Sequence, residues 1–400
     1  MNKKQRIHAI RKQLVNEGIV YVNALSQELC VTERTIRRDL KILSEQGIAE
    51  VFFGGAQMIC SIKTTDFKSQ GINKIMEKMH SKSKPKKLNI GSNTDEIDVY
   101  VLGSFNIDIV SGVSSFPKVG QTIRANSTNF YAGGKGSNQA TAASKVSQHV
   151  HLTIKLGQDE FADKARSYLA STNINTFSIF ESETSPTGNA IIMVSENEKN
   201  NMIAIDLGAN EAFTYEEILS ELQKIKRSKV FLTQMENNFD ITKSAIELAS
   251  GTDAVVILNP APYSEQIKEL IGMVDIITPN ETEASDLSGV LVNDLESARE
   301  AATIIHSMGA SIVVITMGAD GCLLYDGETH THFKPFKAVV IDTVGAGDSF
   351  NGALAASLAK GEQLHYAIKY ASAFASLAVE REGASNMPDD KLVKARLNQQ

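Results

Sequence analysis

The sequence predicts an α/β protein in which a small helical head precedes a larger body with a mostly parallel sheet. From about residue 98 onward, apolar runs of strand length alternate with segments of helical spacing. This alternation is typical of parallel strands covered by helices on both faces. The first 60 residues instead carry apolar residues at the spacing of short amphipathic helices. Because 400 residues exceed one ordinary core, we expect two or three units.

Charge is distributed unevenly along the chain. The formal net charge is −7, but residues 1–90 contain 17 Lys and Arg against 8 Asp and Glu. A basic head on an acidic body predicts that the head alone binds a polyanion. A solvated basic linker would produce the same imbalance, because eight of the 17 cations lie in residues 61–90. Charge alone does not decide between the two interpretations.

Cysteine content and hydropathy indicate in which compartment the protein is expected. Cys30, Cys60 and Cys322 are too scattered for a disulfide framework or a zinc site, so we expect buried free thiols. No run of about 18 apolar residues occurs that could span a membrane. Both observations favour a cytoplasmic protein that does not bind membranes.

The head contains three segments with helical apolar spacing. Their apolar residues are Ile7, Ile10, Leu14 and Val15 in the first, Val22, Leu25 and Leu29 in the second, and Ile36, Leu40 and Leu43 in the third. Asn23 is a possible N-cap of the second helix, and Thr32 can cap a third helix that runs to about Gln46. The second and third helices predict a helix-turn-helix, and residues 48–56 predict a β-hairpin wing behind it.

The third predicted helix presents a polar, mostly basic face. That face carries Arg34, Thr35, Arg37, Arg38 and Lys41. The stretch V-T-E-R-T-I-R-R-D-L-K-I-L-S-E-Q-G-I-A-E-V-F-F-G-G-A, residues 31–56, resembles the DeoR-type winged helix-turn-helix regulators. The resemblance implies that these five side chains bind operator DNA, some at phosphates and others at base edges. The alternative is an exposed cationic helix without a DNA role.

A basic segment separates the head from the body. Residues 81–87 and 89–94 have the Lys, Ser, Asn and Gly content of linkers. We therefore predict a DNA-binding domain over residues 1–60, a flexible linker over 61–96 and the α/β body over 97–394. A flexible tether would allow two heads to reach two half-sites.

Apolar runs at residues 98–102, 230–232, 254–258, 274–277 and 312–316 are predicted to be strands of the body. Ligands of such sheets bind beyond the carboxyl ends of the strands. Polar residues mark that edge: Asn106, Asp108, Glu236, Asn259, Asn280, Thr316 and Asp348. Segments 109–131 and 189–206 are less helical and could supply a small β lid. His149 and His151 are expected to be ordinary surface residues.

A glycine-rich turn followed by an acid is the most informative local pattern of the body. Gly345, Ala346 and Gly347 precede Asp348 where a helix is predicted to begin. Backbone N–H groups at a helix start stabilise negative charge. A carboxylate beside them can accept a proton from an attacking hydroxyl while the amides neutralise phosphate charge. The alternative is that Asp348 only caps its helix. The second glycine loop, residues 132–139, is not a P-loop, because Gly136 follows Lys135.

The body resembles the PfkB carbohydrate kinases, and among them the ribokinases, over about residues 97–390. The resemblance lies in V-L-G-S-F-N-I-D, A-G-G-K-G-S-N-Q-A, N-P-A-P, I-T-P-N-E-T-E-A, I-T-M-G-A-D-G and D-T-V-G-A-G-D-S-F-N-G-A-L, which occur in this order. It implies an ATP-dependent kinase with a ribokinase-like α/β fold, and a β lid that also joins two copies as a dimer.

The resemblance also implies residue roles for catalysis and sugar binding. Asp348 would be the base for the sugar 5-hydroxyl, and Gly345, Ala346 and Gly347 would form the anion hole. The residues implied to bind sugar are Asn106, Asp108, Gly134, Lys135, Gly136, Ser137, Asn138 and Glu236.

Nucleotide and cations are implied in the same way. The implied ATP site consists of Asn280, Thr316, Met317, Gly318, Ala319, Asp320, Gly321 and Gly347. Glu283, in the N-x-x-E pattern with Asn280, would hold Mg²⁺ indirectly. The implied K⁺ ligands are Asp342, Val344, Ala378, Arg381, Gly383 and Met387, mostly through carbonyl groups. Met387 could offer only its backbone.

Together these patterns predict a bifunctional protein, a transcriptional regulator fused to an ATP-dependent kinase for D-ribose or a close pentose. One rival is a sugar-sensing repressor with a non-catalytic kinase fold, but such a sensor would not need Asp348. Another is a kinase for 2-deoxyribose or another small furanose. The expected partners are ATP, the sugar, operator DNA and a second copy of the chain.

Overall fold

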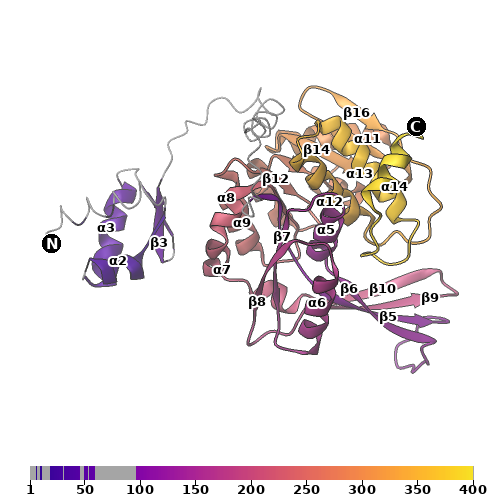
Figure 1. Cartoon of the computed structure of the whole chain (residues 1–400), viewed down its shortest axis with the longest axis horizontal. Coiled ribbons are helices and arrows are strands. Elements are labelled where there is room, and N and C mark those ends of the chain that lie inside the picture. Colours follow the sequence, from indigo (N-terminus) through magenta and orange to yellow (C-terminus); the bar gives the residue numbers. More distant parts are fainter. Residues whose placement is uncertain are drawn as a thin grey trace, which may run out of the picture. The chain divides into compact units, whose positions relative to one another are not determined.

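The computed structural model describes residues 6, 10, 19–29, 31–45, 49–52, 54–58 and 96–399. The chain divides into two compact units, a head and a body (Figure 1). Most of the first predicted helix, the predicted linker, Cys30 and Cys60 lie outside the described residues. Arg6 and Ile10 of that first helix are described, and both are helical and buried. Cys322 is a buried free thiol, as expected.

The head is a helix-turn-helix followed by a hairpin. Its elements are β1 (Ile19–Tyr21), α2 (Val22–Glu28), α3 (Glu33–Glu45), β2 (Ala49–Phe52) and β3 (Gly55–Met58). The hairpin of β2 and β3 is the predicted wing, and β1, which the sequence did not predict, pairs antiparallel with β3. Asn23 is not the N-cap of α2: Tyr21 occupies that position without a side-chain cap, and the Asn23 side chain accepts from the N–H of Ala24.

The body is built on a nine-stranded sheet with the order β16-β15-β14-β13-β12-β11-β4-β7-β8. The strands are β4 (Ile97–Leu102), β7 (Val150–Leu156), β8 (Thr176–Glu181), β11 (Ser228–Thr233), β12 (Val255–Leu258), β13 (Ile276–Ile277), β14 (Ile312–Thr316), β15 (Cys322–Tyr325) and β16 (His330–Phe333). All pairs from β14 to β8 are parallel, and β15 and β16 add an antiparallel edge. The predicted parallel core is therefore confirmed.

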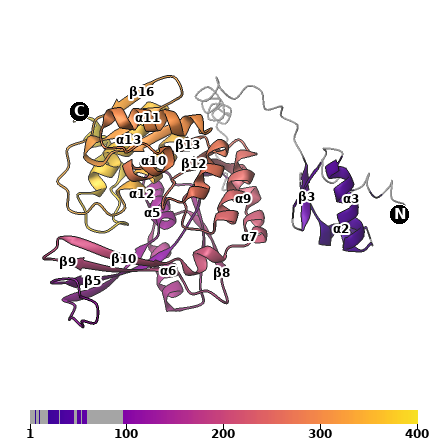
Figure 2. The ribbon, with the colours of Figure 1, turned by 180° about the vertical axis from the view of Figure 1, so that it is seen from behind.

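Helices cover both faces of this sheet (Figures 1 and 2). One layer contains α5 (Lys135–Ser144), α6 (Glu160–Ser171), α12 (Ala346–Ala359), α13 (Leu364–Ala378) and α14 (Asp390–Leu397). The other contains α7 (Tyr215–Ser220), α8 (Leu222–Arg227), α9 (Phe239–Ser250), α10 (Glu281–Ser288) and α11 (Leu295–Ser307). Successive strand residues serve opposite layers: Val99 and Val101 face the first, while Tyr100 and Leu102 face the second. This alternation explains why the strands are continuous apolar runs.

Short 3-10 turns connect several of these elements. They are η1 (Gly208–Ala212), η2 (Glu265–Glu269), η3 (Ile271–Met273) and η4 (Gly318–Asp320). β13 is shorter than the predicted strand, because Val274 still belongs to the end of η3. No helix among the described residues is long and apolar enough to cross a membrane.

A second, smaller sheet forms the predicted lid. Its strands are β5 (Asn106–Val113), β6 (Ser127–Gly133), β9 (Asn189–Ser195) and β10 (Asn200–Asp206), in the order β10-β9-β5-β6. It projects from the body beside α6 (Figure 1). Large apolar side chains on it are exposed: Phe130, Tyr131, Ile191, Val194, Met202, Ile203 and Ile205.

His151 is not the surface residue that the sequence suggested. Its ring is buried and contacts the hydroxyls of Thr176 and Ser178 and the carboxylate of Glu221. Burial lowers the pKa of His151, although the hydrogen bond to Glu221 opposes this. His149 is half-exposed at the start of β7. The described residues contain no group of His, Cys, Asp or Glu that could hold a metal ion on its own.

Candidate functional site

Asp348 lies in the first turn of α12, at the edge of the sheet where the parallel strands end. The preceding Gly345 has a φ of 77°, and a Cβ there would lie 2.8 Å from Ala384, so this turn requires glycine. Nothing lies within 4 Å of the Cβ position of Gly347. Within the described part of the chain, the N–H groups of Gly347 and Asp348 donate to no protein acceptor. The helix start therefore offers free amides beside a buried carboxylate.

Asp108 and Glu236 bring two further carboxylates to this region. Asp108 lies on β5 of the lid, and its carboxyl fills the space above Gly133, where a Cβ would overlap it. Burial, followed by the charges of Glu236 and Asp348, raises the pKa of Asp108 to about 7. Burial also raises the pKa of Glu236, against the opposing effect of Lys135. Burial alone would lower the pKa of Lys135, but Asp348, Glu236 and Glu283 together raise it.

The glycine loop before α5 is hydrogen-bonded to Glu236. The Lys135 N–H donates to a Glu236 carboxylate oxygen at 2.9 Å, and the Ser104 hydroxyl donates to the same oxygen. Gly136 packs against Gly103 so closely that a Cβ on either residue would overlap the other. The Ser137 hydroxyl donates to the Gly133 carbonyl at 2.6 Å, so it stabilises the loop. One Glu236 carboxylate oxygen is thus used by the loop, and the other makes no hydrogen bond to a described residue.

Asn106 is oriented by a residue that the sequence did not single out. The Asn210 side chain donates to the Asn106 Oδ1 at 2.9 Å and also to the carbonyls of Phe105 and Leu207. Because Asn106 uses its oxygen for Asn210, its Nδ2 is the group that remains for a ligand. Asn210 lies 104 residues away in sequence, so no local motif could have indicated this contact.

Asn280 and Thr316 are neighbours, as the two implied nucleotide segments require. They form an isolated parallel bridge between the ends of β13 and β14. Asn280 and Glu283 cap α10 reciprocally, with Oδ1 of Asn280 accepting from the Glu283 N–H and Oε2 of Glu283 accepting from the Asn280 N–H. Burial raises the pKa of Glu283, with a smaller contribution from the Asp348 charge. Carboxylate and amide oxygens of this kind fit a hydrated Mg²⁺.

The residues implied to hold K⁺ lie in the loop before α12, at the end of α13 and in the loop that follows α13. The Asp342 carboxylate accepts from the N–H of Val344 at 2.9 Å and of Gly383 at 3.0 Å. Three of the implied carbonyl ligands already accept hydrogen bonds. The Ala378 carbonyl accepts from the Arg381 N–H at 3.0 Å, and the Gly383 carbonyl accepts from the Asn386 N–H at 3.2 Å. The Met387 carbonyl accepts from the Arg381 guanidinium at 3.3 Å, and the Met387 side chain packs in the core. Each of these carbonyls therefore keeps only its second lone pair for a cation.

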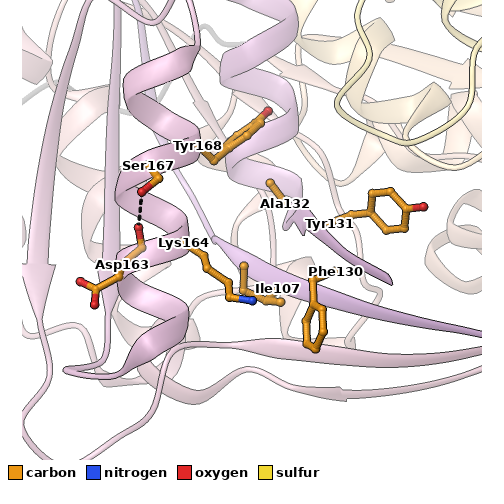
Figure 3. A pocket seen from close by; sticks show the side chains of 8 residues that line it. All are labelled: Ile107, Phe130, Tyr131, Ala132, Asp163, Lys164, Ser167 and Tyr168. Carbon is orange, nitrogen blue, oxygen red and sulfur yellow. Dashed lines mark hydrogen bonds between the residues drawn. The ribbon is translucent and has the colours of Figure 1, made fainter. Parts of the chain in front are cut away.

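A hollow of about 460 Å³ lies between α6 and the lid. Figure 3 shows its lining side chains, Ile107, Phe130, Tyr131, Ala132, Asp163, Lys164, Ser167 and Tyr168. None of the residues implied to bind sugar or ATP lines it. Strand alternation puts Ile107 and Ala132 on the face of the lid opposite Asp108. Tyr131, which also lines the hollow, is the cross-strand partner of Asp108.

On α3 of the head, four of the five predicted DNA-binding residues are exposed. Arg34, Arg37, Arg38 and Lys41 point away from the core that Ile36 and Leu40 form, whereas Thr35 is half-buried and its hydroxyl contacts that of Thr32. Arg37 is paired with Glu33 at 3.0 Å. Arg6 pairs with the buried Asp39 on the opposite face. The basic face predicted from the sequence therefore exists, with one of its four cations already partnered.

Comparison with known proteins identifies both units. Residues 96–391 match the profile of the pfkB family carbohydrate kinases. The chain belongs to this family. Residues 6–61 match the DeoR-like helix-turn-helix domain. The protein is therefore an ATP-dependent carbohydrate kinase that carries a DeoR-like head, as the sequence predicted.

Relatives of this PfkB-family kinase include enzymes named for two sugars. The ribokinase of Haemophilus influenzae is 34% identical over 286 residues, which are 72% of this chain and 93% of that protein. The deoxyribokinase of Salmonella typhimurium is 32% identical over 291 residues, 72% of this chain and 95% of that protein. The solved structure of Arabidopsis thaliana ribokinase, complexed with ribose and ATP, is 30% identical with a TM-score of 0.69. It covers 76% of this chain and 99% of that chain.

Proposed function

We propose that the protein is a bifunctional ribokinase and transcriptional regulator, which converts D-ribose and ATP to D-ribose 5-phosphate and ADP. The observation that carries the kinase half is the carboxylate of Asp348 beside the free N–H groups at the start of α12. This arrangement suits removal of a proton from a sugar hydroxyl next to stabilised phosphate charge. A repressor that only sensed sugar would need neither group, so the arrangement favours catalysis.

In this proposal the sugar is bound between the lid and the glycine loop. Asn106, Asp108 and Glu236 hold the ring hydroxyls together with Gly134, Lys135 and Asn138 of the loop. Gly136 and Ser137 shape the loop, since Gly136 packs against Gly103 and the Ser137 hydroxyl donates to the Gly133 carbonyl. Asp348 accepts the proton of the 5-hydroxyl, whose oxygen attacks the γ-phosphorus as the bond to ADP breaks. Amides of Gly345, Ala346 and Gly347 form the anion hole, in which the N–H of Gly347 is free.

The nucleotide would lie beyond the ends of β13 and β14. Asn280 and residues Thr316, Met317, Gly318, Ala319, Asp320 and Gly321 line it, together with Gly347. Mg²⁺, when bound with ATP, would neutralise phosphate charge, and Glu283 would hold it indirectly through water. K⁺ would be held by Asp342 and by the carbonyls of Val344, Ala378, Arg381, Gly383 and Met387, of which those of Ala378, Gly383 and Met387 also accept hydrogen bonds within the protein.

A second candidate substrate is 2-deoxyribose. The Salmonella typhimurium deoxyribokinase covers this chain as fully as the ribokinase and at nearly the same identity. Asp108 and the Nδ2 of Asn106 are the groups available to bind ring hydroxyls. If one of them binds the 2-hydroxyl, ribose will be the better substrate, because a ligand that lacks the hydroxyl leaves a buried polar group without a partner.

The regulatory half of the proposal rests on the basic face of α3. We propose that residues 1–60 bind operator DNA through Arg34, Thr35, Arg37, Arg38 and Lys41, in the cytoplasm. Residues 61–96 serve as a linker, and the kinase domain, residues 97–394, supplies the dimer that presents two heads to one palindromic site. The exposed apolar side chains of the lid support a contact between two copies.

One experiment tests both halves. Purified protein is assayed with ATP, Mg²⁺ and K⁺ on ribose, 2-deoxyribose and a panel of furanoses, and is titrated against DNA from its own upstream region. We expect a kcat/KM for ribose above that for 2-deoxyribose, and nanomolar DNA binding. Equal kcat/KM for both sugars would defeat the ribose assignment, and an inactive protein that binds DNA would support the sensor.

A further inference from the structure

Two side-chain amides of α5 bind the proposed base directly. Nδ2 of Asn138 donates to Oδ2 of Asp348 at 3.1 Å, and Nε2 of Gln139 donates to Oδ1 at 3.0 Å. Each carboxylate oxygen therefore has one amide donor and keeps a lone pair for a substrate proton. α5 and α12 lie close together at this level, since a Cβ on Gly352 would overlap the Gln139 carbonyl. Gln139 is completely buried, and its neighbours in the sequence motif gave no sign of this role.

The orientation of the Gln139 amide is fixed by its other partners. Its Nε2 also donates to Oδ1 of Asn259 at 3.0 Å, and its Oε1 accepts from Nε2 of Gln234 at 2.6 Å. If the amide rotated by half a turn, its oxygen would face the oxygens of Asp348 and Asn259, and no donor would remain between them. The hydrogen bonds of Gln139 to Asn259 and Gln234 therefore keep its Nε2 group, the donor, directed at the Asp348 carboxylate.

These contacts continue into a closed circuit of buried hydrogen bonds. Nδ2 of Asn259 donates to the Thr278 carbonyl at 3.3 Å, and the Thr278 hydroxyl donates to Oδ1 of Asn351 at 2.6 Å. Nδ2 of Asn351 then donates to the Gly347 carbonyl at 2.9 Å, which returns the circuit to the residue beside Asp348. Every side chain of the circuit is at most 7% exposed.

The circuit connects the catalytic helix to the sheet. Gln234, Asn259 and Thr278 are the first residues after β11, β12 and β13, which are adjacent strands of the sheet. Gln139 and Asn351 lie on α5 and α12. One network thus joins three strand ends to the carboxylate of Asp348 and to the carbonyl of Gly347, a residue whose N–H belongs to the proposed anion hole.

We propose that Gln139 is a positioning residue of the kinase reaction. Supported by Gln234 and Asn259, it holds the Asp348 carboxylate aimed at the sugar hydroxyl, while Asn351 holds the carbonyl of Gly347 beside it. Amide donors stabilise the charged form of a carboxylate, and fixed geometry of base and anion hole lowers the barrier. The inference rests on the proposed role of Asp348 as the base. A purely structural network would affect folding but neither the pH profile nor the balance of kcat and KM.

The test uses full-length variants. Gln139→Met keeps the volume but removes the donor, and we expect kcat to fall by roughly 10- to 100-fold with both KM values within about threefold. The acidic limb of the kcat profile, measured at saturating ribose so that the pH dependence of KM does not enter, should move to higher pH, because the carboxylate has lost a donor. Gln139→Glu should be more damaging, since it places an acceptor against Asp348. Gln234→Leu, which does not touch Asp348, should lower kcat by about threefold to tenfold.

Thr141→Val is the matched control. Thr141 is buried on the same helix, but its hydroxyl contacts Ser137 and Tyr168, outside the circuit. The Thr141→Val variant should retain the wild-type kcat, KM values and pH profile. Gln139→Met with more than about a third of wild-type kcat and an unmoved acidic limb would overturn the proposal. If Gln139→Met does not fold, Gln234→Leu and Asn351→Leu decide the same question, and unchanged kinetics in both would contradict it.

A measurement without turnover separates this inference from the proposed function. In ¹⁵N spectra of the wild-type protein, the side-chain amide of Gln139, assigned by its loss in Gln139→Met, should titrate with pH. The titration should vanish in Asp348→Asn. This outcome would support the contact even if the wild type phosphorylated no sugar, which would contradict only the proposed function. A Gln139 amide that does not titrate would remove Gln139 from the carboxylate.

Discussion

Two helices of this chain are proposed to bind phosphate, and they are built in opposite ways. α3 of the head carries its charge on long side chains, Arg34, Arg37, Arg38 and Lys41, which are all exposed. α12 of the body has no cation in its first turn and offers backbone N–H groups beside the buried Asp348. Exposed cations bind any nearby phosphate and are screened by salt. Backbone amides at a helix start act only on a phosphate delivered to them, and their position is fixed beforehand.

The difference follows from what each helix must do. DNA binding requires many weak contacts that adapt to a long polyanion, so flexible side chains in solvent are suitable. Phosphoryl transfer requires a few donors in one geometry, so the donors are peptide groups and the surrounding amides are locked. The following predictions test this contrast, in order of decreasing expected effect.

Asp348→Asn should lower kcat by roughly 10²- to 10⁴-fold, because the general base is lost while the helix start remains. Asn keeps the shape of the residue, so nucleotide binding should persist. Initial rates at saturating sugar and ATP provide the measurement, and fluorescence titration with an ATP analogue serves as the control. A variant with more than about a tenth of wild-type kcat would exclude Asp348 as the base.

Arg38→Ala should weaken DNA binding by roughly tenfold and lower the slope of log affinity against log salt by about one, if Arg38 contacts a phosphate. Arg37→Ala should cost less, because Arg37 gives up its pair with Glu33 at 3.0 Å when it binds DNA. Affinity titrations at several salt concentrations measure both. Kinase kcat is the control for each variant and should not change. Equal losses for Arg37 and Arg38 would show that the Glu33 pair is irrelevant.

Sugar binding should depend on pH near neutrality. Because the pKa of Asp108 is raised to about 7, its carboxylate becomes protonated below that pH and loses acceptors for sugar hydroxyls. KM for ribose should therefore rise as pH falls below about 7, by up to about tenfold per unit, while KM for ATP changes less. Asp108→Asn should raise KM for ribose and abolish this dependence. A KM for ribose that is flat from pH 8 to 6 would contradict the prediction.

The Asp108 carboxyl should also make the stability of the fold depend on pH. Its charged form should favour sugar binding but disfavour folding. A carboxyl whose folded-state pKa lies above its unfolded value stabilises the fold at low pH, and this contribution disappears as pH rises through the folded pKa. Without sugar, Asp108→Asn should therefore raise Tm more at pH 8 than at pH 5. Calorimetry at the two pH values measures the difference. A larger gain at pH 5 would mean that burial does not penalise the charged form.

The smallest expected effect is on the kinase when the head is removed. Residues 91–400 should keep wild-type kcat and KM, since every residue of the proposed kinase site lies there. Sugar or sugar phosphate should shift DNA affinity of the whole chain only if it binds the free and DNA-bound arrangements differently. Titrations of DNA with and without ribose, ribose 5-phosphate and ATP would reveal this. Identical affinities would mean that the two activities share a chain without coupling.

Sequence reasoning succeeded where the structure depends on neighbouring residues. The turn before Asp348 and the alternation that predicts a parallel core are both local patterns. The wing was likewise predicted from one short stretch. Each of these follows from backbone geometry within a few residues, which a single sequence records.

It failed where the structure depends on distant residues or on weak local signals. Asn210 orients Asn106 from 104 residues away, and Gln139 contacts Asp348 across 209 residues. The three-residue strand β1 is too short to show a period. His151 was expected at the surface because its ring is polar. Nothing near it in the sequence indicates that the buried carboxylate of Glu221, 70 residues later, will contact it. Only the folded chain brings these partners together.

Gly133 shows how one side chain can constrain the evolution of another. Its φ is not in the left-handed region, so the backbone alone would accept alanine there. The obstacle is the Asp108 carboxyl, which occupies the space of a Cβ. A lineage could therefore gain a side chain at position 133 only after position 108 had lost its acid. If Asp108 binds the sugar, that order of steps passes through a kinase with weakened substrate affinity, and selection for sugar use would preserve a glycine that has no side chain to contact the sugar.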